Sequence, residues 1–99
     1  MGRQRSAAER ELYQRCDEVL HYVWDPIRVA GEPGARDEYA GYLPQVFRRV
    51  LDGQGIDQIA DDLVRIETEL MGLRPNRDRA ENAATTLLKW RDWIEGRAS

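Results

Sequence analysis

The sequence predicts an all-α fold, namely a compact four-helix domain. Four segments repeat apolar residues at the three- and four-residue spacing of one helix face, and no segment alternates apolar and polar residues as an amphipathic strand does. Glycine, proline and helix-capping residues separate these segments. Because 99 residues suffice for one modest core, we expect residues 1–99 to form a single helical domain, with residues 1–5 and 96–99 frayed at its ends.

The first helix is predicted over about residues 6–24. Ser6 and Glu9 form a capping-box pattern, in which the two side chains satisfy amides at the start of a helix. Apolar residues then follow at helical spacing: Leu12, Cys16, Val19, Leu20 and Val23. Pro26 ends the segment, because its ring disfavours helical geometry in the residue before it.

The second helix is predicted over residues 37–52, after an irregular loop at residues 25–36 that contains two prolines and two glycines. Its apolar face is broad, so we expect a central position in the bundle. Pro44 leaves the start open, because proline is harmless in a first turn but costs about 3 kcal/mol in a helix interior. The helix begins either near Gly41 or at Asp37 with a bend.

The third helix is predicted over residues 56–71 and the fourth over residues 76–95. Along the third, the apolar stripe is Ile59, Leu63, Ile66 and Leu70, and Gly72 follows as a stop signal. Asn76 is a good N-cap for the fourth helix. The inward face of the fourth helix is expected to contain Ala80, Ala83, Leu87, Trp90 and Ile94.

The composition argues against several classes of function. A net charge of −3 without a clustered basic surface argues against a nucleic-acid partner. No apolar run approaches the ~20 residues that span a bilayer, and the N-terminal residues lack the apolar core of a signal peptide. We therefore expect a cytoplasmic protein with no membrane partner. One cysteine and one histidine cannot form a zinc site, and no phosphate-binding loop occurs, so no cofactor, metal or catalytic residue is predicted.

One candidate pocket lies under the loop at residues 25–36. His21 and Asp25 are four residues apart, so the carboxylate can orient the imidazole as a general base. Trp24 and Tyr39 are the other predicted lining residues. The alternative interpretation is structural: Trp24 plugs the junction of helix and loop, Tyr39 belongs to the core, and Asp25 shapes the turn before the proline.

Three residues are candidates for contact with a partner. Asp57 and Asp61 lie on one helix face in the acidic segment at residues 52–70, where the alternative is a solvated acidic surface. Trp93 lies beside the inward stripe of the last helix, and tryptophan is enriched at binding hot spots. Its alternative is packing against the flank of the first helix.

A family resemblance rests on three short stretches. They are VWDP at residues 23–26, DEYAGY at residues 37–42 and IETELMGL at residues 66–73, followed by an Ala/Leu-rich last helix. In this order they resemble the YugE-like family of small all-helical bacterial proteins of unknown function, over roughly residues 12–94. The resemblance implies a compact helical fold and provides no catalytic residues.

Our leading hypothesis is therefore a non-enzymatic protein-interaction module, adaptor- or immunity-like in role. Its partner is another protein or a second copy of itself in a homodimer. The alternative is a small-ligand-binding protein or weak enzyme that uses the pocket under the loop.

Overall fold

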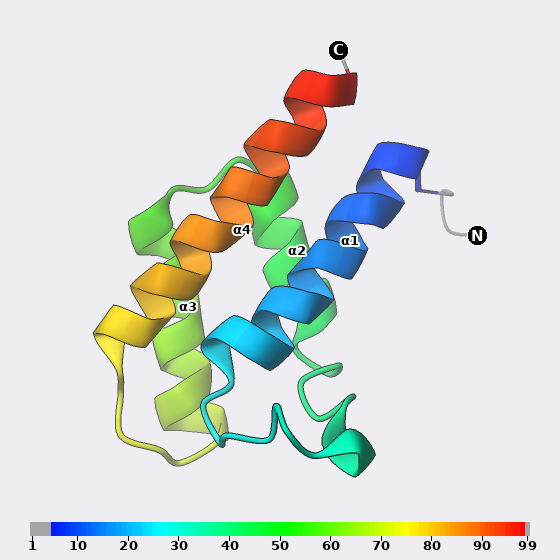
Figure 1. The fold of residues 1–99 in the computed structure, drawn as a ribbon. Coiled ribbons are helices and arrows are strands. Elements are labelled where there is room, and N and C mark those ends of the chain that lie inside the picture. Colours follow the sequence, from blue (N-terminus) through cyan, green and yellow to red (C-terminus); the bar gives the residue numbers. More distant parts are fainter. Residues whose placement is uncertain (1–4, 99) are drawn as a thin grey trace, which may run out of the picture.

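The computed structural model describes residues 5–98, which form a bundle of helices (Figure 1). The four α-helices are α1 (Ala7–Val19), α2 (Leu43–Leu51), α3 (Ile56–Arg65) and α4 (Arg77–Ala98). The described residues contain no strand. The predicted all-α, four-helix fold is therefore confirmed.

The N-terminus of α1 has the predicted capping box. The amide of Glu9 donates to the hydroxyl of Ser6 over 3.1 Å, and the amide of Ser6 donates to the carboxylate of Glu9 over 2.9 Å. These two bonds satisfy backbone donors that a helix start leaves without intrahelical partners.

Two of the helices, α1 and α3, each end in a π-helical turn. The turn Leu20–Trp24 extends α1 and the turn Ile66–Leu70 extends α3, so the helical segments nearly match the predicted ranges 6–24 and 56–71. A π turn bonds each amide to the carbonyl five residues earlier, as the amide of Asp25 does over 3.0 Å. Both turns lie at the same end of the bundle (Figure 1).

The second helix is shorter than the sequence predicts. The prediction of a helix over residues 37–52 is wrong at its start, because α2 begins at Leu43 and places Pro44 in its first turn. There the missing proline N–H leaves no hydrogen bond unmade. The preceding residues form successive turns, such as the one closed by the amide of Tyr42 on the carbonyl of Tyr39 over 3.0 Å. The alternative of a start near Gly41 was the better one.

The core forms where α4 meets the other three helices. Three alanines with no exposed surface (Ala80, Ala83 and Ala84) let neighbouring helices approach closely. In Figure 1, α1 and α4 run side by side at the front of the bundle, with α2 and α3 behind them. The second helix was predicted to be central, but α4 holds that place, because it packs against α1 and α3 more extensively than α2 packs against any helix.

The last helix also differs from its predicted end. Residues 96–98 belong to α4, whereas the sequence predicts fraying from residue 96. The guanidinium of Arg97 explains the difference, because it pairs with Glu11 of α1 and stacks on the ring of Trp93 at 4.3 Å. Of the other residues expected to fray, 1–4 and 99 lie outside the described residues.

None of the helices in the described part of the chain is both long and apolar enough to cross a membrane.

Candidate functional site

The first candidate region is the junction between α1 and the loop that follows it. Asp25 adopts a left-handed conformation (φ 35°) directly after the π turn. Its carboxylate accepts hydrogen bonds from the hydroxyl of Tyr39 over 2.7 Å and from the amides of Val29 and Ala30 over 2.7 and 3.1 Å. The Tyr39 oxygen in turn accepts from the amide of Ile27 over 3.1 Å. Asp25 therefore organises the loop around its own carboxylate.

These bonds set the protonation states of the pair. Partial burial alone would raise the pKa of Asp25, but the hydrogen bonds from Tyr39, Val29 and Ala30 outweigh it and lower the pKa. Burial, and then the bond to Asp25, raise the pKa of Tyr39. Near neutral pH Asp25 therefore stays charged and Tyr39 stays protonated. A general acid or base works best with a pKa near the working pH, so this pair suits a structural role.

His21 does not form the predicted hydrogen bond to Asp25. Its side chain is 2% exposed, and its Nδ1 atom has no hydrogen-bond partner among the described residues. The ring instead packs edge-on against Tyr22, with 4.4 Å between centroids. The carboxylate predicted to orient the imidazole instead accepts hydrogen bonds from Tyr39 and from two backbone amides.

Trp24 joins three parts of the fold. It has no exposed surface, and its indole N–H donates to Glu67 over 2.7 Å. The second carboxylate oxygen of Glu67 accepts from the backbone N–H of Asn76 over 2.9 Å, and the guanidinium of Arg79 lies 3.6 Å from the oxygen that binds Trp24. This arrangement connects the two π turns to the start of α4. Glu67 itself has no exposed surface.

The four predicted pocket residues are thus brought together, but they fill the space between them. Trp24, His21 and Tyr39 are buried, and the rings of Trp24 and Tyr39 lie 5.4 Å apart. Only Asp25 is partly exposed. A ligand at this point would have to displace packed side chains, so the arrangement corresponds to the structural interpretation of these residues.

The carboxylates of Asp57 and Asp61 both form ion pairs with one guanidinium, that of Arg77. Both are exposed on α3, and Arg77 at the start of α4 pairs with Asp61, with Asp57 over 3.6 Å and with Glu81 over 3.0 Å. Exposed ion pairs of this kind contribute little to stability, because water and salt screen them. Among residues 5–98 no group of three or more His, Cys, Asp or Glu side chains is placed to hold a metal ion. A partner at this surface would have to compete with Arg77.

Trp93 lies on α4, and 54% of its surface is exposed. Its ring meets Trp90 of the same helix edge-on, with 5.8 Å between centroids. A groove of about 400 Å³ runs along α4 here, lined by Thr86, Lys89, Trp90 and Trp93. The lining of the groove is mainly apolar, so it suits an apolar side chain.

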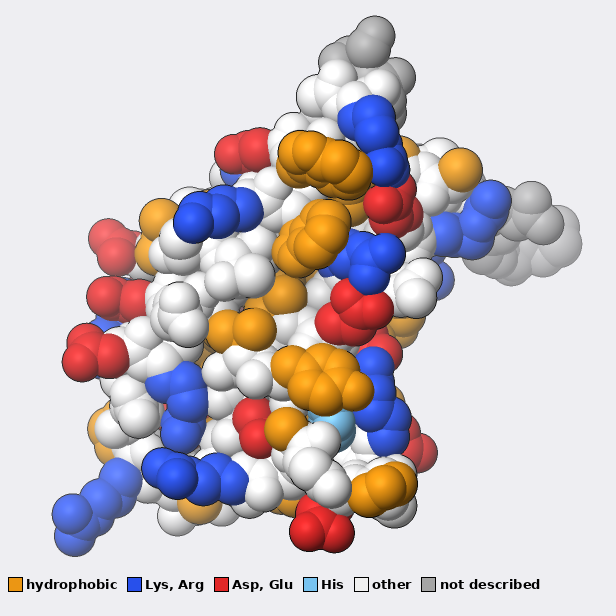
Figure 2. Space-filling model, viewed as in Figure 1, with side chains coloured by type: hydrophobic (Ala, Val, Ile, Leu, Met, Phe, Trp, Pro, Cys, Tyr) orange, Lys and Arg blue, Asp and Glu red, His pale blue; other side chains and the backbone are white. Residues whose placement is uncertain are grey.

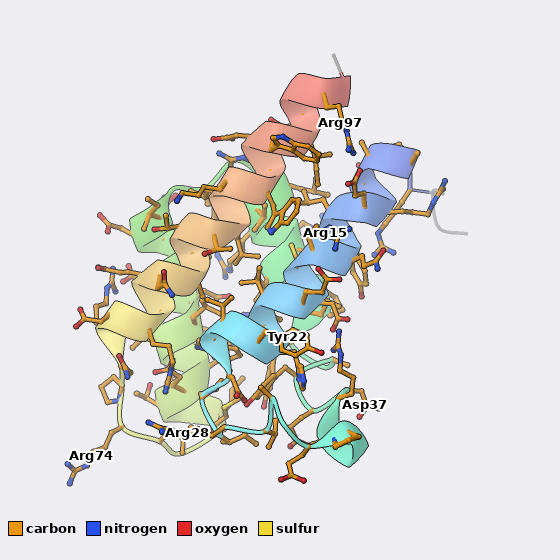
Figure 3. All side chains as sticks on the ribbon, viewed as in Figure 1. Arg15, Tyr22, Arg28, Asp37, Arg74 and Arg97 are labelled. Atoms are coloured by element: carbon orange, nitrogen blue, oxygen red, sulfur yellow. The ribbon has the colours of Figure 1, made fainter. Side chains whose placement is uncertain are left out.

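A third aromatic residue, Tyr22, continues this surface on the π turn that extends α1. It is 58% exposed, and we call Tyr22, Trp90 and Trp93 the aromatic strip. Figure 2 shows apolar side chains running down this face between charged ones, and Figure 3 places Tyr22 at its lower part. The sequence analysis missed Tyr22. The available signal was an aromatic side chain outside the apolar stripe of an amphipathic helix.

Each ring of the strip is covered by an arginine. The distances from guanidinium carbon to ring centroid are 4.3 Å for Arg97 on Trp93, 5.0 Å for Arg15 on Trp90 and 5.4 Å for Arg36 on Tyr22. Such cation–π contacts are worth about 0.5–1 kcal/mol at exposed sites. They hold the rings in fixed orientations without burying them.

The chain matches no family model, no curated protein and no solved structure. The resemblance to the YugE-like family therefore stays a prediction.

Proposed function

We propose that this protein is a non-enzymatic, cytoplasmic protein-interaction module that binds its partner through the aromatic strip on α1 and α4. The observation that carries the proposal is the exposure of Trp93, at 54%, beside the apolar groove of α4. Burying a large aromatic ring removes about 150–250 Å² of surface from water. Because folding leaves 54% of Trp93 exposed, roughly half of this area remains to be buried against another molecule.

The residue types of the strip support a protein partner. Interfaces are enriched in Trp, Tyr and Arg, and hot spots favour the same three types. The strip consists of two tryptophans and a tyrosine, each in contact with an arginine. The cation–π contacts fix the rings in advance, which lowers the entropy cost of ordering them on binding.

The chemistry of the buried cluster does not favour an enzyme. Asp25 has a lowered pKa and Tyr39 a raised one, so neither exchanges protons readily near neutral pH. The cluster also lies under packed side chains. The strip is therefore the stronger candidate site.

Photo-crosslinking in the cell of origin tests this proposal. A photoreactive amino acid replaces Lys89, which is exposed in the groove. We expect light-dependent adducts to a discrete protein, whether a different chain or a second copy. The adducts should be lost when Trp93→Ala is introduced into the same chain.

Arg74 is the matched control position, because its exposed side chain points away from the bundle at the end opposite the C-terminus (Figure 3). The same photoreactive group there should give no discrete adduct. Equal labelling at both positions, or no adduct at position 89, would contradict the proposal.

A further inference from the structure

The nature of the partner can be inferred from the charges around the aromatic strip. This inference rests on the proposed function, because it assumes that the strip is a binding surface. We propose that the strip binds a second copy of this chain, packed face to face and antiparallel about a two-fold axis that passes between Arg15 and Glu18.

The arginines of the strip are each paired with a carboxylate of α1. The pairs are Arg97 with Glu11, Arg15 with Glu18 at 2.5 Å and Arg36 with Asp17 at 3.0 Å. These groups contribute three positive and three negative charges to the surface. A strongly acidic or strongly basic partner therefore gains little attraction here, whereas a partner with the same mixture of charges has matching groups.

The charges also follow a definite order along α1. From one end to the other it is Arg97 with Glu11, then Arg15, then Glu18, then Tyr22 with Arg36. Figure 3 shows Arg97, Arg15 and Tyr22 in this order down the front of the molecule. At 1.5 Å per residue, Glu11 and Tyr22 are about 16 Å apart along the helix.

A two-fold axis between Arg15 and Glu18 brings opposite charges of the two copies together. It places Arg15 of each copy opposite Glu18 of the other, so that the Arg15–Glu18 pair of one chain and that of the second chain join into one cluster of alternating charges. A two-fold interface is self-complementary in this sense.

The same operation brings the exposed rings together. Trp93 lies level with Glu11, because Arg97 contacts both. Trp93 therefore meets Tyr22 of the second copy, and the two most exposed rings of the strip cover each other twice per dimer. A parallel arrangement would instead set each charge of α1 against its own copy, which is repulsive.

Charge exchange between two variants tests the dimer and its register. Wild-type chain is expected to sediment as a dimer that dissociates on dilution. The Glu18→Arg variant gives both central positions a positive charge and the Arg15→Glu variant gives both a negative one. Each variant alone should bind itself at least tenfold more weakly than wild type. An equimolar mixture of the two should recover dimers that contain one chain of each.

Three controls keep the test interpretable. Arg48→Glu reverses an exposed charge on α2, behind the strip, and should leave the dimer unchanged. Trp93→Ala should weaken it at least tenfold. Circular dichroism of each variant should give the helical spectrum of wild type, so that loss of the dimer is not loss of the fold.

The failure of this inference can be distinguished from failure of the proposed function. A wild-type chain that stays monomeric at hundreds of micromolar overturns the second-copy proposal, and adducts at position 89 to a different protein would then leave the binding face intact. A dimer that survives both charge variants, or a mixture that recovers nothing, overturns the proposed register. A monomer that also gives no adduct contradicts both.

Discussion

Trp24 and Trp93 are the same side chain in opposite surroundings. Trp24 has no exposed surface, and its N–H donates to a buried carboxylate, that of Glu67, over 2.7 Å. Trp93 is 54% exposed, and its ring is covered on one side by the guanidinium of Arg97. The first tryptophan is part of what holds the chain together. The second is held by contacts with other surface side chains and contributes little to the core.

The difference between them indicates how to separate a structural aromatic residue from a binding one. A buried indole requires a hydrogen-bond acceptor, since an unpaired buried donor costs about 1–3 kcal/mol. An isolated exposed ring is common and needs no explanation. Trp93 differs from such a ring because Trp90 and Tyr22 extend it into a strip, and each ring of that strip has an arginine against it.

The largest expected effect on the free energy of unfolding comes from the buried tryptophan, Trp24. Trp24→Ala should lower the free energy of unfolding by about 3–5 kcal/mol, because it leaves a cavity in the core and removes a donor from a buried carboxylate. Urea denaturation followed by circular dichroism measures the change. A loss below about 1 kcal/mol would mean that Trp24 does not hold the α1–α3 junction. Trp24→Phe, which keeps most of the ring, should fall between the alanine variant and wild type.

The second prediction concerns the acceptor of that hydrogen bond. Glu67→Gln should cost about 1–3 kcal/mol, because the Trp24 indole and the backbone N–H of Asn76 donate to different oxygens of the carboxylate, so the NH₂ group of glutamine must face one of these two donors. A double-mutant cycle that combines Glu67→Gln with Trp24→Phe measures the coupling energy between Glu67 and Trp24. Additive costs in that cycle would show that the two side chains do not interact in solution.

The sequence predicted the fold better than the site, for reasons that these residues illustrate. Helix periodicity and the Ser6 capping box are local, so they placed α1 within a residue of its observed start. The buried acids are not local. Asp62 and Glu67 looked like members of a solvated acidic segment, yet they are 5% and 0% exposed, because partners from distant segments neutralise them. Glu67 also falls in the apolar stripe that continues from α3 into the π turn Ile66–Leu70. That position is the feature of the sequence that indicates burial.

The candidate site shows the same limit. Trp93 was recognised as a contact residue because it lies off the inward stripe. The strip itself was not predictable, because it depends on α1 and α4 lying side by side, so that Arg15 covers Trp90 and Arg97 reaches Glu11. The residues predicted to line the pocket are indeed neighbours, but they leave no space for a ligand. Its residues meet, but their own rings fill the volume between them.

The third prediction joins stability to pH through Asp25. Its pKa is lowered in the folded state, so its contribution to stability is present above its unfolded pKa of about 3.9 and is lost as the pH falls through the lower, folded value. Tyr39→Phe removes one of the hydrogen bonds that lower it and should cost about 1–2 kcal/mol at neutral pH. The variant should also lose less stability than wild type as the pH falls below about 4. Parallel urea titrations at pH 7 and pH 3 measure both effects, and identical pH profiles would exclude Asp25 as the responsible carboxylate.

The smallest expected effect is on the exposed side. Trp93→Ala should lower the free energy of unfolding by about 0.5–1 kcal/mol, because it removes the cation–π contact with Arg97 but leaves the core intact. The measurement must use a concentration at which wild type is monomeric, because self-association adds concentration-dependent stability by mass action. At higher concentration the wild type should gain stability that the variant does not, and this growing difference would come from the interface alone. A loss of several kcal/mol in the dilute monomer would instead make Trp93 a second structural tryptophan, and the comparison with Trp24 would no longer distinguish a core from a binding face.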